Sequence, residues 1–491
     1  MDDPAPLPDD ARWRCERAAR LSVIIDADDY FAAARQAMLT ATRSILLIGW
    51  DFDARVDLGS SAEAPDAPRQ VGEFILWLAD RTPTLTVNLL RWDIGAIKSL
   101  FRGNTMLTVL RWMRHKRITT KLDGHHPASA SHHQKIVIVD DRIAFCGGID
   151  MTGDRWDTRA HADHEPRRKR PGGQPYKPWH DAICALEGPA AVALGELFRE
   201  RWQAAGGGPI APRATDGTAQ WPALLGEPHF TDVPVCISRT RPRLPDQEEV
   251  REIERMTVAL IAAARRTLYI ESQYFASRRV AEALARRLAE ADPPEIVIIN
   301  PLTAQGWLEP IAMDTARARL MEALRRIDTH GRLRLYHPYT AGGEPIYCHA
   351  KILIADDRVI RVGSSNLNNR SMGLDTECDL TLDSAACDDP AVAARILAIR
   401  DDLLAEHLGT SPETVTARIA AEGSMIGAIE ALRGPGRSLR PYELEDVSAV
   451  TAWLADNEVL DPEGPDEMFE ALDERRLTRR LRRLAGRVRG R

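Results

Sequence analysis

Short apolar runs alternate with amphipathic stretches along most of the chain. A helical periodicity over about residues 29–42 precedes the apolar run Ser44–Trp50, and a similar periodicity over about residues 248–264 precedes Thr267–Glu271. Runs of branched apolar residues bounded by polar positions are typical of buried strands. The pattern therefore predicts a helix followed by a strand at two distant places in the sequence.

Both series continue with further strands and close with a helix. The strands are predicted at LTVNLL (from Leu85), EIVIIN (from Glu295), 133–139, 142–146, 349–355 and 358–362, and the closing helices near 190–204 and 391–408. Strands that alternate with helices favour an α/β fold with helices on both faces of a sheet. We expect two similar α/β domains, each a mixed β-sheet flanked by helices, related by a pseudo-two-fold axis.

The repetition extends to the residues themselves. When 348–366 is aligned with 132–150, an offset of 216, 8 of 19 positions are identical. RSILLIGWDF from Arg43 also matches RTLYIESQYF from Arg266, at an offset of 223. Two matches at nearly one offset indicate two similar halves that differ by a small change in loop length.

Composition divides the chain into four segments. The first half spans 17–205, a linker rich in glycine and proline spans 206–246, and the second half spans 247–410. A helical extension is expected over 411–491. Within the first half, the polar stretch 155–178 is predicted to be a long loop, of the kind that often borders an active site.

Charge is distributed unevenly. The formal net charge is −7, yet 475–491 contains nine arginines and no acidic residue, so removing that tail leaves −16. Leucines and a valine at helical spacing make the tail a basic amphipathic segment, which suits anionic lipid, nucleic acid or simple solvation. The body is therefore acidic.

Composition also bears on location. Apolar residues make up 44% of the chain and charged residues 28%, as expected for a soluble globular protein. No apolar run is long enough to cross a bilayer and no apolar leader is visible at the N-terminus. The seven cysteines are scattered without a CxxC pair, which argues against a disulfide framework or a zinc site and for a reducing compartment. We expect a cytoplasmic protein, peripheral to the membrane where it meets lipid.

The repeated segment places charged residues on a strand. On an extended chain His133 and Lys135 project to one face, and Asp140 lies at the strand end. The corresponding residues of the second half are His349, Lys351 and Asp356. If the halves meet about a pseudo-two-fold axis, one site holds two imidazoles and two ammonium groups. We expect the histidine, the lysine and the aspartate of each motif to be catalytic residues.

This set suits phosphodiester chemistry. Lysines can hold non-bridging phosphate oxygens, a neutral imidazole can attack phosphorus, and a protonated imidazole can donate to the leaving alkoxide. The chemistry needs neither a metal nor another cofactor. Each ring also needs a partner on its second nitrogen, for which Asp181 in WHDAICALEG and Glu377 in TECDLTLD are the candidates.

Two copies of HxKxxxxD resemble the paired signature of the phospholipase D superfamily. GSSN (363–366) stands where that family has GSxN, and GGID (147–150) resembles the first motif of eukaryotic-type members. The further similar stretches are GWDFD, DRWDT, PWHD, ESQYF and NRSMGLDTE, and the resemblance covers about 17–409.

The resemblance implies a phosphoric diester hydrolase with one active site shared by two α/β domains. Its substrate would be a glycerophospholipid, cleaved to phosphatidic acid and a free alcohol or transferred to another alcohol. The family pattern makes His133 the nucleophile and His349 the general acid, an order that the similar halves leave open. Ser364 and Asn366 would contact phosphate oxygens or brace the lysines, whereas Asp150 replaces an asparagine and leaves the matching contact of the first half open. No calcium requirement is expected.

The sequence is compatible with four functions: a phospholipase D, a cardiolipin synthase-type transferase, a nuclease and a non-catalytic lipid-binding scaffold. Intact motifs argue against the scaffold, and the acidic body argues against nucleic acid as a partner, although EPRRKRPGG is a local basic stretch. GGID, DRWDT and PWHD favour the phospholipase. Aromatic residues that could line a substrate channel are Trp50, Trp92, Trp156, Trp179 and Tyr274.

Overall fold

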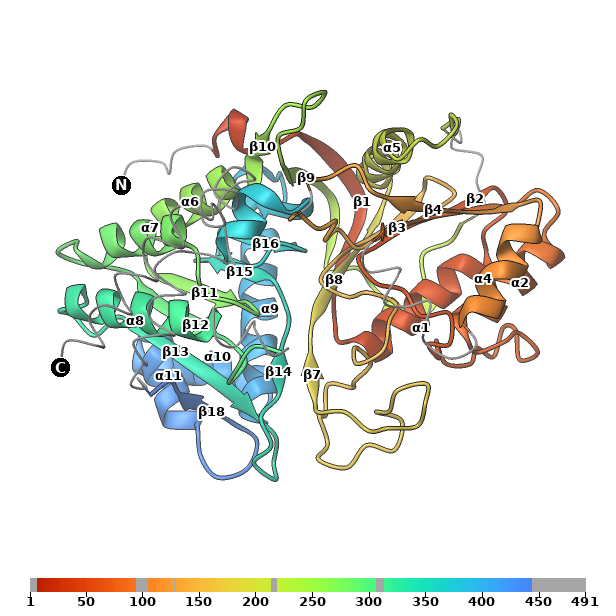
Figure 1. Ribbon diagram of the computed structural model, residues 1–491. Helices are drawn as coiled ribbons and strands as arrows, with labels where there is room; N and C mark the ends of the chain where they lie inside the picture. The colour runs from red at the N-terminus through yellow and green to blue at the C-terminus, as the bar shows by residue number, and fades with distance from the viewer. Residues whose placement is uncertain (1–6, 94–104, 128, 213–218, 306–312, 444–491) are drawn as a thin grey trace, which may run out of the picture.

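The computed structural model describes residues 7–93, 105–127, 129–212, 219–305 and 313–443. The α/β class expected from the sequence is confirmed: two lobes of strands and helices lie side by side, the first half on one side and the second half on the other (Figure 1). The two lobes meet along a shared central region, where segments of both halves are in contact.

The first half contains seven long strands and four helices among the described residues. Its strands are β1 (Arg14–Ile25), β2 (Ser44–Gly49), β3 (Thr86–Trp92), β4 (Ile118–Asp123), β5 (Ile136–Val139), β6 (Ile143–Gly147) and β8 (Ala182–Glu187). Its helices are α1 (Ala27–Leu39), α2 (Val71–Arg81), α4 (Thr105–Arg114) and α5 (Pro189–Ala204).

The second half repeats this order. Its strands are β9 (Phe230–Arg241), β11 (Thr267–Glu271), β12 (Glu295–Ile299), β13 (Leu333–Tyr339), β15 (Ile352–Ala355), β16 (Val359–Gly363) and β17 (Glu377–Asp383). Its helices are α6 (Glu252–Ala263), α7 (Arg278–Leu288), α8 (Thr315–Ile327) and α9 (Ala391–Leu408).

The two halves share one continuous sheet of 16 strands. Its order is β18-β13-β12-β11-β15-β16-β17-β9-β1-β8-β6-β5-β2-β3-β4, where β18 is Ser438–Pro441, and the short β10 (Val250–Arg251) is paired to β9. Apart from β18, the order is the same on either side of the β9–β1 pair, and β2–β3–β4 are parallel as β11–β12–β13 are. The internal repeat of the sequence is thus a repeat of topology.

The expected linker was wrong in part, because residues 206–246 contain the long strand β9. Strand β9 pairs with β1 of the first half and β17 of the second, so it joins the two sheets. Its pairing partners lie far away in sequence, and the glycine- and proline-rich surroundings concealed it. Strand β1 was likewise not predicted.

The C-terminal extension is helical only in part. Helices α10 (Pro412–Glu422) and α11 (Met425–Leu432) are followed by strand β18 (Ser438–Pro441), which pairs antiparallel with β13 at the sheet edge. The strand is short and gains its ladder only from β13, so local periodicity could not reveal it. The basic tail, 475–491, lies outside the described residues.

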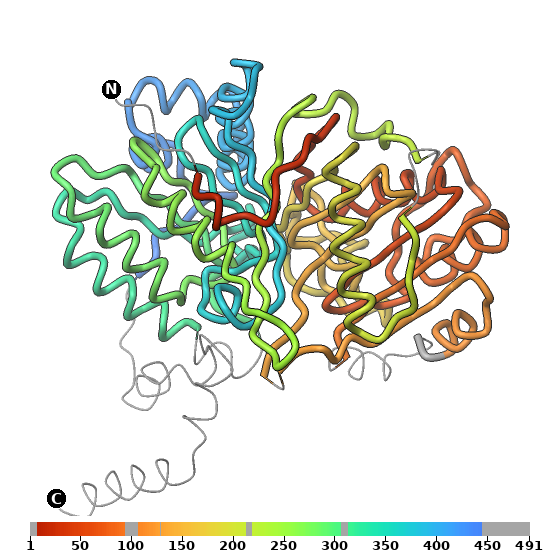
Figure 2. The backbone as a smooth tube through the Cα atoms, turned by 90° about the horizontal axis from the view of Figure 1, so that it is seen from above, coloured from red at the N-terminus to blue at the C-terminus, as the bar shows by residue number. Residues whose placement is uncertain are grey.

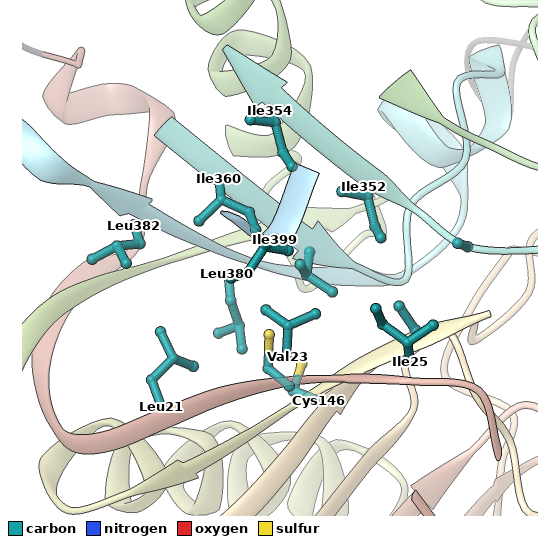
Figure 3. Packing of buried hydrophobic residues seen from close by; sticks show 14 of the residues in the cluster. Leu21, Val23, Ile25, Cys146, Ile352, Ile354, Ile360, Leu380, Leu382 and Ile399 are labelled. Carbon is teal, nitrogen blue, oxygen red and sulfur yellow. The ribbon is translucent and has the colours of Figure 1, made fainter. Parts of the chain in front are cut away.

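The largest buried apolar cluster lies between the halves. Leu21 and Val23 of β1 face Ile352 of β15 and Leu380 of β17 across this core (Figure 3). Burial of apolar surface contributes about 25 cal/mol per Å², so a core shared by both lobes fixes them as one body. The N-terminal segment also crosses from the second lobe to the first, as Figure 2 shows.

A disulfide corrects the interpretation of the cysteines. Cys15 of β1 is bonded to Cys236 of β9, 221 residues away in sequence. The pairing depends on the register of two adjacent strands, which cysteine spacing does not reveal. The spacing therefore no longer supports a reducing compartment. In the described part of the chain, no helix combines the length and apolarity that crossing a bilayer requires.

Candidate active site

Each motif histidine lies just before a strand rather than on it. Strand β5 begins at Ile136 and β15 at Ile352, so His133 and His349 occupy the extended segments that precede these strands. The backbone N–H of His133 donates to the carbonyl of Thr376 at 2.9 Å, and that of His349 donates to the carbonyl of His180 at 2.7 Å. Each histidine backbone is thus anchored to the opposite half.

The side chains are paired across the halves in the same way. Nδ1 of His133 lies 3.0 Å from Oε1 of Glu377 and 3.1 Å from the carbonyl oxygen of Ser364. Nδ1 of His349 lies 2.6 Å from Oδ2 of Asp181. Because a carbonyl oxygen can only accept, Nδ1 of His133 carries the hydrogen. The structure therefore brings both predicted carboxylates to the histidines, each from the opposite half.

A short two-stranded parallel sheet makes this exchange possible. Strand β7 (Trp179–His180) of the first half pairs with β14 (Tyr347–Cys348) of the second. Asp181 follows β7 and His349 follows β14, so the two residues leave the small sheet side by side. Figure 1 shows β7 and β14 where the lobes meet.

Glu377 is buried and held by two hydroxyl groups. Oγ of Ser371 donates to Oε1 at 2.7 Å, and Oγ of Ser364 donates to Oε2. Burial raises the pKa of Glu377 to about 8, although nearby Lys135 opposes the rise. The hydroxyl of Ser364 therefore braces Glu377 behind His133 instead of bracing a lysine, which the resemblance had implied as one alternative.

Burial also lowers the pKa of both histidines well below the usual 6.5. For His133 the ammonium groups of Lys135 and Lys351 add to the effect of burial, and for His349 Lys351 and Arg155 do so. The sequence led us to expect one neutral and one protonated ring near neutral pH. In the protein without substrate the protonated form of both rings is disfavoured, so the negative charge of a phosphodiester is what would restore a proton to the acid.

The two lysines have different surroundings. Nζ of Lys135 donates to the carbonyl of His133 at 2.6 Å and lies 3.4 Å from Oδ2 of Asp150. Nζ of Lys351 donates to the carbonyl of His349 and lies 3.4 Å from the neutral amide oxygen of Gln273. Burial lowers the pKa of Lys351 to about 7, an effect that Asp181 opposes. Asp150, which replaces the family's asparagine, thus provides an anionic neighbour to one lysine only.

This asymmetry predicts pH-dependent anion binding. Protonated Lys351 attracts an anion, so affinity for a non-cleavable dialkyl phosphinate should stay constant below about pH 7 and then weaken up to about tenfold per pH unit. In Lys351→Arg the guanidinium remains charged, and the break should move up toward the pKa of about 8 of Glu377. Calorimetric titration between about pH 6 and 9 measures the affinity for the phosphinate in the unmodified protein and in Lys351→Arg. Constant affinity in the unmodified protein would contradict the assigned role of Lys351.

Both histidines line one cavity of about 380 Å³ between the halves. Polar groups of the wall include Asn366, Asp150, Arg155 and Arg370. Of the five aromatic residues expected at a substrate channel, Trp50, Trp92, Trp179 and Tyr274 line this cavity. Trp156 lines a separate surface pocket together with part of EPRRKRPGG.

Asp140 and Asp356 were wrongly expected to be catalytic. Both carboxylates accept hydrogen bonds from three successive backbone N–H groups, of 42–44 for Asp140 and of 265–267 for Asp356, at 2.7–2.9 Å. They lie at the far ends of β5 and β15 from the histidines, and neither lines the cavity. They fix the start of β2 and β11, which explains why this residue type recurs in both motifs.

Several residues of the cavity were not identified as site residues from the sequence. Arg370 and Asp375 form an ion pair at 2.8 Å, and the carboxylate of Asp375 also accepts the N–H of Ser131 beside His133. Arg155 lies over the ring of Trp179 at 4.3 Å. Arg155 belongs to the stretch DRWDT, and Arg370 and Asp375 belong to NRSMGLDTE. These motifs therefore marked the region of the site but did not indicate which of their side chains line the cavity.

The comparisons with known proteins agree with this geometry. A family model described as Phospholipase D matches residues 37–218, and one described as Cardiolipin synthase, PLD-like domain, matches 257–396. Phosphatidylserine synthase from Haemophilus influenzae Rd KW20 has a similar fold, with a TM-score of 0.54, 13% identity and coverage of 85% of this chain and 96% of that one.

Curated relatives carry the same family name. Phospholipase D A of Dictyostelium discoideum is 25% identical over 485 residues, covering 80% of this chain and 36% of the relative. Phospholipase D1 of Schizosaccharomyces pombe is 26% identical, covering 59% and 28%, and phospholipase D alpha 3 of Arabidopsis thaliana is 23% identical, covering 70% and 58%. This chain thus spans between 28% and 58% of the length of these relatives. With a family domain matched in each half, the chain is a member of the phospholipase D superfamily, with two such domains.

Proposed function

We propose that the protein is a phosphodiesterase of the phospholipase D type that hydrolyses glycerophospholipids to phosphatidic acid and a free alcohol, or transfers the phosphatidyl group to another alcohol. The observation that carries the proposal is the pair of histidines in one cavity, each bound at Nδ1 by a carboxylate of the opposite half. This arrangement leaves Nε2 of each ring available for chemistry at a single phosphorus atom.

In the first step, Nε2 of neutral His133 attacks phosphorus. An N–P bond forms, the P–O bond to the head group breaks, and His349 donates a proton from Nε2 to the departing alkoxide. Glu377 accepts the Nδ1 hydrogen of His133. The positive charge that the ring gains favours the carboxylate form of Glu377, which stabilises the ring in turn. Lys135, Lys351 and Asn366 supply charge and hydrogen bonds to the non-bridging oxygens.

In the second step, His349 acts as the base and His133 is the leaving group. His349, now neutral, takes a proton from water or an alcohol, whose oxygen attacks phosphorus and displaces His133. Asp181 orients the ring of His349 throughout and stabilises its protonated form. Each histidine ends in its starting state, and the phosphodiester has exchanged its head group for hydrogen or another alkyl group.

The aromatic residues of the cavity wall favour a lipid substrate, because they offer apolar surface to the part of the lipid next to the phosphate. Trp50 and Trp92 stack with ring centroids 5.8 Å apart, and Trp179 stacks on Tyr347 at 4.6 Å. These rings provide apolar surface next to the histidines, against which glycerol and the first acyl carbons can pack. Arg155 and Arg370 add positive charge for the phosphate.

A second candidate is a phosphatidyltransferase of the cardiolipin synthase type. It is favoured by one observation, the description of the family model that matches the second half. Its chemistry would be identical, with a lipid alcohol as acceptor in the second step.

The direct assay is incubation with mixed phospholipid vesicles, with and without ethanol. The proposal predicts phosphatidic acid without ethanol and phosphatidylethanol in its presence, detected by mass spectrometry. A His133→Gln protein is the matched control and should form neither product. Cardiolipin as the sole product would favour the transferase, whereas cleavage only of oligonucleotides would contradict both lipid proposals.

A further inference from the structure

A second cluster of titratable side chains lies outside the cavity. Asp26 follows β1, His161 belongs to the loop 155–178, His180 ends β7, and Glu406 belongs to α9 of the second half. The side chains of all four are at most 1% exposed. The proposed reaction uses none of them, and burying so many ionisable groups is costly unless each has a partner.

Each of the four residues offers one possible ligand atom, and these atoms lie within 4.8 Å of one another. Nε2 of His161 lies 3.4 Å from Oδ2 of Asp26 and 3.1 Å from Oε1 of Glu406. Nδ1 of His180 lies 3.5 Å from Oδ1 of Asp26 and 2.8 Å from Oε1 of Glu406. Ligands at 2.0–2.1 Å from a tetrahedral Zn²⁺ would lie about 3.3–3.4 Å apart. Three of these four separations are close to that value, and the separation between His180 and Glu406 is shorter.

The outer nitrogens of both rings are already bound by carboxylates. Nδ1 of His161 lies 3.0 Å from Oδ2 of Asp157, and Nε2 of His180 lies 2.8 Å from Oε2 of Glu271. Histidines that ligate metals nearly always donate their other N–H in this way, which fixes the tautomer and orients the ring. The inner nitrogens are thereby the ones that face Asp26 and Glu406.

Asp26 supplies an independent indication. Its side chain is buried, and within the described ranges Oδ2 has no hydrogen-bond donor, although it points at His161. Its backbone has a φ of 65°, unusual for a residue other than glycine, and His161 has a φ of 41°. A buried carboxylate oxygen without a donor is costly unless a group outside the polypeptide, such as a cation, completes its surroundings.

We propose that Asp26, His161, His180 and Glu406 bind one divalent transition-metal ion, with Zn²⁺ as the best match to two imidazoles and two carboxylates. Without metal, each ring must carry two protons to satisfy its carboxylate neighbours. Binding releases one proton from each ring and introduces two positive charges, so the net charge of the cluster is unchanged. The cysteine spacing argued only against a thiolate site, and this set contains no cysteine.

The ion would have a structural role close to the active site. Four protein ligands leave no open position for substrate, as in closed structural zinc sites. Oδ1 of Asp26 accepts the N–H of Asp181 at 3.1 Å, and the carbonyl of His180 accepts the N–H of His349. The metal would join the first half to α9 and brace the segment that holds the Asp181–His349 pair.

Metal content is the first test. The full chain, purified without metal-affinity resin, is unfolded, stripped with chelator and refolded with Zn²⁺ or Co²⁺, then desalted and analysed by mass spectrometry of the elements. About one ion per chain is expected, and Co²⁺ should give the visible absorption bands of a tetrahedral site. Less than about a tenth of an ion per chain in the unmodified protein would overturn the proposal; the cluster would then be a network of protonated histidines.

Variants locate the ion. His161→Gln should lose the stoichiometric metal and the Co²⁺ bands. The matched control is His115→Gln, which removes a histidine that pairs with Asp80 at 3.2 Å on the surface and should keep both. Metal retained by His161→Gln, or lost equally in His115→Gln, would contradict the assignment. If His161→Gln does not fold, the Co²⁺ spectrum of the unmodified chain still decides the question.

Discussion

Replacing His133 with glutamine is expected to abolish turnover of every phosphodiester substrate, including one with a p-nitrophenol leaving group. The variant has no nucleophile, so a good leaving group cannot rescue it, and the loss should be at least about 10⁴-fold in kcat. The amide of glutamine can still reach the Glu377 region, which should limit damage to the fold. Steady-state rates with p-nitrophenyl and choline esters measure the effect.

The p-nitrophenyl ester distinguishes the nucleophile from the general acid, because only loss of the nucleophile should prevent its cleavage. A His133→Gln protein that turned over the p-nitrophenyl ester at a rate near that of the unmodified protein would show that another group attacks phosphorus. Binding of a dialkyl phosphinate serves as the control for folding, because the other residues that line the cavity are unchanged.

Replacing His349 with glutamine should separate substrates by leaving group. With an alkyl head group the departing alkoxide needs a proton, so kcat should fall by about 10²–10⁴-fold. p-Nitrophenolate departs without a proton, so the burst of p-nitrophenol from the first step should persist. Hydrolysis of the adduct should then be slow, because the same histidine is the base of the second step.

Stopped-flow absorbance resolves this burst from the steady state. A burst of about one p-nitrophenol per chain followed by slow turnover supports the assignment of His349 as acid and base. Equal loss of the burst in His349→Gln and His133→Gln would remove the distinction between the two rings and with it the proposed order of roles.

The fold was largely predictable because its signals are local and occur twice. Strand β11 begins and ends where the apolar run Thr267–Glu271 predicts, and α9 coincides with the closing helix expected at 391–408. Strands β1 and β9 escaped prediction because their long ladders pair with strands that lie far away in the sequence. The disulfide between Cys15 and Cys236 depends on the same long-range pairing.

The candidate site was predictable in its residue types and less so in its connections. His133, Lys135 and their counterparts are read directly from the motif, and Asp181 and Glu377 from their positions at strand starts. The exchange of carboxylates between halves requires knowledge of the β7–β14 pairing, which involves only two residues of each strand. Asp140 and Asp356 were misassigned because a residue can recur in both motifs for a structural reason as well as for a catalytic one, and the sequence does not distinguish the two.

The cluster around Asp26 could not be predicted from the sequence. Its four residues come from four separate elements, and three of them belong to no motif that the sequence singled out for chemistry. His180 lies within PWHD, where Asp181 drew attention instead. Only the three-dimensional arrangement reveals that these side chains lie together.

The central claim is that phosphorus passes through a covalent bond to a histidine of the first half, with a histidine of the second half managing the protons. Its most direct test is rapid mixing with a radiolabelled phosphatidyl substrate, quenching in alkali, where N–P bonds survive, and peptide mapping by mass spectrometry. The account predicts a transient phosphatidyl adduct on His133 in the unmodified protein. Label on His349, or complete turnover with no labelled peptide at any time, would contradict it.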